Sequence, residues 1–210
     1  MAEKDKKRRR RNVVLAILAG GSILGVGAAV TLATWQDDEY ANGTFTAGTF
    51  DLQGQVNTTE GFAEHATAPG GALGFDLNAS NLSPTDVTYS PYAVQLSANT
   101  TSAATVTVSA ATPTNAGNTA NLTYAVYEVS TWGCSSATTL GTALIPAGTA
   151  LGTVPAATTF TLAAAATPQY LCFVVTAGSG LTQGQSAAAV WDFHATSTTS
   201  IGTPTPTATP

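Results

Sequence analysis

The sequence predicts an all-β protein, an antiparallel β-sandwich of the jelly-roll or immunoglobulin-like type, preceded by an N-terminal signal helix. Three observations predict it. All seven basic residues lie between Lys4 and Arg11, and an uncharged apolar run follows them. The rest of the chain alternates threonine, valine and aromatic residues over short segments, which favours strands. Clusters of Gly, Pro, Asn and Ser separate these segments, as in sandwiches and barrels.

The first element is an export signal. Its basic head, residues 4–11, precedes an apolar core, residues 13–33, that is long enough to span a bilayer as a helix. The head keeps its end in the cytoplasm by the positive-inside rule while the body is exported. A small-x-small site ends at Ala33, next to the acidic stretch 37–39, so we expect cleavage between Ala33 and Thr34. A retained membrane anchor is the alternative that the length of the core leaves open.

The body is expected to contain eight short strands. In order, they are residues 44–52, 73–77, 87–97, 104–109, 122–130, 158–162, 170–176 and 188–195. In the fifth of them, Leu122, Tyr124 and Val126 form one apolar face by period two. Glu128 breaks this face and should therefore lie near the end of the strand. No amphipathic helix is expected after the leader.

The body is expected to be a single domain of 48–198, preceded by an extended segment, 34–47, and followed by a disordered Thr/Pro-rich tail, 199–210. About 177 residues remain after the leader, which is enough for one medium domain with a core. Turn-forming residues predict loops at 57–71 and 112–120.

The two cysteines, Cys134 and Cys172, are an even pair in an exported chain, so a disulfide is expected between them. Two free buried thiols are the alternative, and two widely spaced cysteines give little support for a metal site. The bond would close a loop of about 39 residues and contribute roughly 4 kcal/mol in the chain-entropy model. It would join the strand at 170–176 to the loop that follows Trp132.

The lack of lysine and arginine after Arg11 argues against several classes of function. Nothing in the body can neutralise phosphates, so no nucleic-acid partner is expected. Neither histidine, His65 or His194, lies in a zinc-protease motif, and no serine lies in a nucleophile elbow, so we expect no catalytic site, metal or cofactor. The acidic stretch 37–39 lacks the glycine-punctuated loop of known calcium sites.

The region after the cleavage site resembles a known family. An aromatic residue, Trp35, and the acidic stretch lead into the pattern F-x-x-G-x-F-x-L, formed by Phe45, Gly48, Phe50 and Leu52. With its basic head and long Gly/Ala core, the chain is similar over residues 4–52 to exported proteins with SipW-type signal peptides. These are the TasA/camelysin-like family, and the similarity is greatest to its actinobacterial members.

The resemblance implies a secreted structural protein of the cell surface or of an extracellular biofilm matrix, processed by a SipW-like signal peptidase. It also implies self-association into fibres, in which residues 34–47 add as a strand to the next subunit. An extended segment can supply main-chain hydrogen bonds to an open sheet edge and apolar side chains to its groove. Here Trp35, Tyr40 and Phe45 would be the anchors. Only the leader would contact the membrane. A monomeric surface binding module or adhesin is the alternative.

Overall fold

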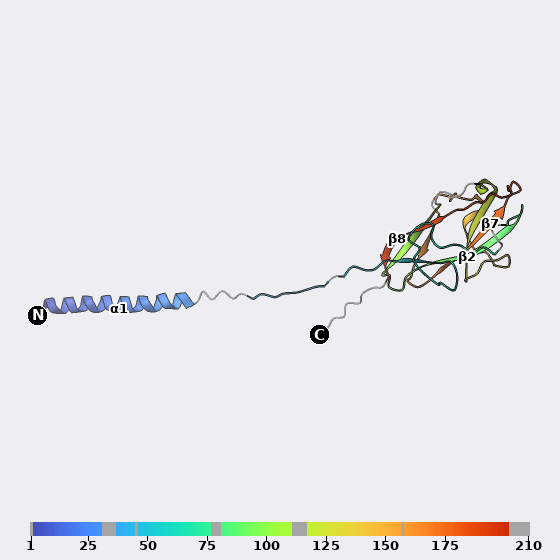
Figure 1. Ribbon diagram of the computed structural model, residues 1–210. Coiled ribbons are helices and arrows are strands. Elements are labelled where there is room, and N and C mark those ends of the chain that lie inside the picture. The colour runs from blue at the N-terminus through green and yellow to red at the C-terminus, as the bar shows by residue number, and fades with distance from the viewer. Residues whose placement is uncertain are drawn as a thin grey trace. The chain divides into compact units, whose positions relative to one another are not determined.

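The computed structural model describes residues 2–30, 37–44, 46–76, 81–110, 117–156 and 158–201. The chain forms two compact units, Met1–Phe45 and Thr46–Pro210, which we describe separately. The first contains the expected helix, α1, Ala2–Val30 (Figure 1). Its described side chains, those of residues 4–18, include the whole basic head. Among the residues described, no helix is both long and apolar enough to cross a membrane.

The second unit is a β-sandwich, which confirms the predicted fold class. Its eight strands are β1 Leu52–Gln55, β2 Val87–Leu96, β3 Ser102–Ala110, β4 Leu122–Val129, β5 Ala143–Ala150, β6 Thr159–Leu162, β7 Gln169–Ala177 and β8 Trp191–Ser200. Five form one sheet in the order β1-β2-β7-β4-β5, and three form the other in the order β6-β3-β8. All their ladders are antiparallel. Figure 1 labels β2 and β7, which pair in the larger sheet, and β8 of the smaller one.

Alternation along the strands gives each sheet an inner face. In β4, Leu122, Tyr124 and Val126 are buried, as the period-two pattern predicts, and Glu128 is the last residue but one of the strand. The opposite sheet supplies buried side chains from β3, among them Val106. The two inner faces therefore share one hydrophobic core, which draws its members from every strand of both sheets except β1 and β8, with side chains from those two packed against it.

Six of the eight expected strands coincide with β2, β3, β4, β6, β7 and β8. The strand expected at 44–52 is wrong, because only its last residue, Leu52, belongs to a strand, β1. The residues before it make isolated backbone contacts instead of a ladder. The N–H of Thr101 donates to the carbonyl of Thr49 at 2.9 Å, and the N–H of Ser97 donates to that of Asp51 at 3.0 Å.

The strand expected at 73–77 is also wrong over its described residues, 73–76. The Asp76 N–H donates to the Tyr89 carbonyl at 2.9 Å, and its carboxylate accepts the Tyr89 N–H at 2.8 Å and the Thr88 hydroxyl at 3.0 Å. The Asp76 carboxylate, and not a backbone carbonyl, therefore accepts the Tyr89 N–H, so these residues do not form a strand ladder with β2. In contrast, β5 was not expected, because Pro146, Gly148 and small residues remove the alternation by which a strand is recognised.

The expected loops are present where they are described. In 57–71, the Asn57 side chain accepts the backbone N–H groups of Thr59 and Glu60 at 3.0 and 2.8 Å, which fixes a turn. The end of the loop expected at 112–120 contains a short 3-10 helix, η1, Thr119–Asn121. β8 continues to Ser200, and residues 202–210 of the expected tail lie outside the described residues.

Candidate assembly site

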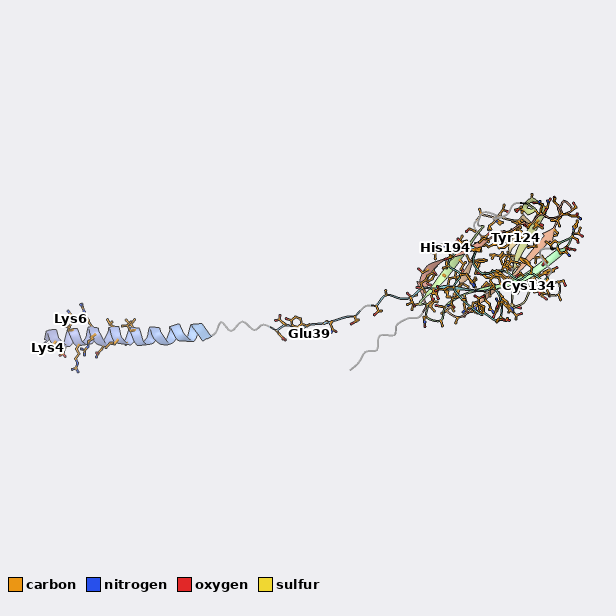
Figure 2. The ribbon with its side chains drawn as sticks, viewed as in Figure 1. Lys4, Lys6, Glu39, Tyr124, Cys134 and His194 are labelled. Carbon is orange, nitrogen blue, oxygen red and sulfur yellow. A yellow bond between two sulfur atoms is a disulfide. The ribbon has the colours of Figure 1, made fainter. Side chains whose placement is uncertain are left out.

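The disulfide between Cys134 and Cys172 is confirmed, with Cα atoms 5.1 Å apart. Cys172 lies in β7, on the outer face of the larger sheet, between Pro91 of β2 and Tyr127 of β4. Cys134, labelled in Figure 2, lies in the loop between β4 and β5. The bond therefore fastens this loop to the outer face of the central strand, where Cys172 is fully buried.

Four of the residues predicted for processing and assembly, Ala33, Thr34, Trp35 and Phe45, lie outside the described residues. Tyr40 is described, and its side chain is 89% exposed. The acidic stretch 37–39 is exposed as well, and Figure 2 labels its last residue, Glu39. An extended, exposed aromatic residue is thus present in the segment that was predicted to act as a donor.

Three of the four edge strands of the sandwich are blunted. β1 has four residues, and Ala63 bridges its outer side, where Gly54 and Ala63 exchange two backbone hydrogen bonds of 2.9 Å. β6 also has only four residues. β5 contains Pro146 and Gly148, and both interrupt a regular ladder.

The fourth edge strand, β8, lacks these features, although its ladder with β3 has one register shift, between the pairs Ser102–Ser200 and Ala104–Ser197. It is ten residues long, contains no proline, glycine or lysine, and pairs with β3 alone among the described strands. The other edge of such a strand presents unpaired backbone N–H and C=O groups, which can bind a further strand.

A cleft of about 1290 Å³ opens between the sheets beside β8. Its lining includes Tyr92 and Phe173 from the larger sheet, Trp191 and Phe193 from β8, and loop residues from 64–75 and 181–190. The ring centroids of Tyr92 and Phe193 are 5.0 Å apart, and those of Phe173 and Trp191 are 4.9 Å apart. Tyr92 and Phe173 are also in edge contact at 6.2 Å, so the four rings form one aromatic wall that joins the two sheets.

Two buried polar atoms line the cleft. The indole nitrogen of Trp191 and Nδ1 of His65 are buried and make no hydrogen bond of normal geometry with the described residues. Nε2 of His65 lies 3.3 Å from Oε1 of Glu60. Burial raises the pKa of Tyr92 to about 12, because the phenolate would lose its hydration there. Burial also raises the pKa of Tyr124, and its interaction with the Trp191 side chain partly offsets this rise.

The two histidines belong to different elements, His65 to the loop at 57–71 and His194 to β8. His194, labelled in Figure 2, is exposed on β8 and faces the same side as Asp192, as expected from period two. The Asp192 carboxylate accepts the Ser109 hydroxyl at 3.3 Å. Within the described ranges, no group of three or more His, Cys, Asp and Glu side chains is placed to hold a metal ion.

Tyr92, Phe173 and Phe193 were not predicted as site residues from the sequence. They could have been found from the period-two alternation of β2, β7 and β8, which places these aromatic side chains on the inner faces of the sheets once the strands are known. The open cleft has no such signal, because it depends on the spacing of the two sheets and on the loops that line it.

Comparisons with known proteins give no assignment. No family model matches the chain, and no curated protein matches it.

Proposed function

We propose that this is an exported structural protein of the cell surface or extracellular matrix, which assembles by strand donation. Residues 34–47 of one subunit pair with the β8 edge of the next. The observation that carries the proposal is the unprotected ten-residue edge of β8 beside an aromatic-lined cleft. Main-chain hydrogen bonds along β8 give the affinity, and side chains that enter the cleft give the register.

The donor segment has the alternation that this geometry requires. Small or apolar residues occupy every second position, namely Ala41, Gly43, Phe45 and Ala47. The positions between them are polar, namely Asn42, Thr44 and Thr46. In an extended strand the first set faces one side and the second set the other. The first set therefore turns toward the cleft, and Phe45 is its one large side chain.

The same period of two divides the predicted anchors. Trp35 shares the side of Phe45, whereas Tyr40 lies on the opposite side of the strand. Phe45 is thus the main apolar anchor, and Tyr40 remains at the surface of the assembled sheet. Asp37 and Glu39 share the side of Phe45, so the segment must leave the cleft before it reaches them, because burying carboxylates unpaired would cost far more than the aromatic contacts contribute.

The proposal is tested on protein secreted by cells that express the full chain, using light scattering and electron microscopy. Phe45→Ser should weaken assembly by about 3 kcal/mol, or roughly 100-fold in the concentration needed for filaments. Tyr40→Ser is the matched control and should leave this concentration within a few-fold of the wild type. Deletion of residues 34–47 should leave a folded monomer, whereas deletion of 202–210 should not prevent filaments.

Two results would contradict the proposal. If the secreted wild-type protein stays monomeric at all concentrations, the alternative of a monomeric binding module replaces fibre formation. If filaments form equally well without residues 34–47, assembly uses another surface, and the donor segment has no part in it.

A further inference from the structure

The outer face of the smaller sheet carries a regular array of threonines. Two rows cross the three strands in register, Thr159–Thr107–His194 and Thr161–Thr105–Thr196, listed from β6 through β3 to β8. Each of β3 and β6 therefore presents a Thr-x-Thr pair, and β8 continues one row. We call these five threonines the threonine face. All of them except the half-buried Thr105 are exposed.

Threonine-rich composition alone does not account for this face, because the larger sheet differs. The outward residues of β2, β7 and β4 include Tyr89, Pro91, Tyr170, Val174 and Tyr127, with one threonine pair, Thr123 beside Thr176. The β propensity of threonine acts on both sheets alike. The array is thus a property of one surface of the molecule.

The hydroxyls of the threonine face are free to bind an external partner. Among the described residues, none of these five hydroxyl groups has a hydrogen-bond partner in the protein. Elsewhere, threonine hydroxyls bond to nearby carbonyls, as Thr149 does to Pro146 at 2.7 Å and Thr158 to Pro155 at 2.9 Å. The face therefore offers hydroxyls that can donate and accept, each held beside a methyl group.

We propose that the threonine face binds ice. Alternate residues of a strand are about 6.7 Å apart, and neighbouring strands are about 4.8 Å apart. Tetrahedral water with oxygen–oxygen hydrogen bonds of about 2.75 Å repeats at about 4.5 Å between second neighbours and about 7.3 Å along the axis of hexagonal ice. The array therefore approximates the ice lattice in both directions, with hydroxyls to join it and methyl groups to restrict the water between them.

Other repeating ligands fit the face less well. It has no aromatic side chain to stack on a sugar ring, and no lysine or arginine to bind an anionic polymer. Its ionisable residues are His194 within the array and Asp192 beside it. The right-handed twist of sheets limits how many neighbouring strands can match a flat lattice. A face of only three strands is small, but its twist is small enough for the threonines to meet one ice plane.

The test is the partition of secreted protein into slowly growing ice, with inhibition of ice recrystallisation as a second readout. The wild type should be enriched in the ice fraction by at least tenfold over a non-binding protein added to the same solution. Thr107→Lys places a charge at the centre of the array and should abolish the enrichment. Thr139→Lys makes the same change in the exposed β4–β5 loop and should leave it intact.

The melting temperatures of both variants must match that of the wild type, and if Thr107→Lys is destabilised, Thr107→Ala takes its place. Exclusion of the wild type from ice overturns the proposal, and so does equal enrichment of the Thr107 variant. Retention on crystalline cellulose or chitin together with exclusion from ice also overturns it, in favour of a polysaccharide partner. The outcome is independent of strand donation, because the five threonines all belong to one subunit.

Discussion

Removing the disulfide should lower the free energy of unfolding by about 4 kcal/mol. The bond joins residues 38 positions apart, so its loss allows the unfolded chain the many conformations that a closed loop forbids. The variant is Cys134→Ser with Cys172→Ala. Alanine is preferred at Cys172, because this position is fully buried and a serine hydroxyl there would have to find a partner. For a body of this size, 4 kcal/mol corresponds to a fall in melting temperature of about 8–16 °C.

The assay is reversible unfolding of the secreted protein by urea and by heat, with and without a reducing agent. Reduction should lower the stability of the wild type to that of the double variant and should leave the double variant unchanged, which is the control. A loss below about 1 kcal/mol would refute the loop-entropy reasoning. It would mean that packing of the β4–β5 loop, rather than the covalent bond, holds this loop against the outer face of β7.

Four further outcomes are expected. Terminal sequencing of the secreted protein should find Thr34 first, and recovery of the intact leader in membranes would favour an anchor. Filament formation should strengthen from pH 7 to pH 4, measured by light scattering, because protonation of carboxylates lowers repulsion between lysine-free subunits. Burial raises the pKa of Tyr92 to about 12, whereas an unfolded tyrosine ionises near pH 10, so the free energy of unfolding should fall as pH rises between these values, by up to about 3 kcal/mol, and Tyr92→Phe should remove that share of the fall in urea denaturation. Thr85 has a φ of 73°, in the region that favours glycine, so Thr85→Gly should raise the unfolding free energy by about 1 kcal/mol, measured by urea denaturation.

The sequence predicts those parts of the fold that depend on local alternation. β4 was placed within one residue and its inner face was assigned, because Leu122, Tyr124 and Val126 occupy every second position and are buried, although the intervening Ala125 is buried as well. The disulfide followed from the even number of cysteines together with the expectation of export.

Features set by neighbours in space could not be predicted in the same way. Thr49 and Asp51 lie in a strand-like sequence, but a strand needs a partner, and only isolated hydrogen bonds are available to them. β5 pairs with β4 despite Pro146, because at an edge the lost N–H can face away from the ladder. The open side of β8 and its cleft depend on the order of the strands, which alternation does not encode.

The position of Trp191 gives the protein an optical reporter of its own. The chain has three tryptophans: Trp35 in the expected donor segment, Trp132 in the disulfide loop and Trp191 in the cleft. Replacing the first two by phenylalanine leaves a single indole packed 4.9 Å from Phe173, whose emission colour depends on whether water or protein surrounds it. Filling of the cleft could then be timed by intrinsic fluorescence, with no attached dye, in a body that has no lysine for the usual amine labelling.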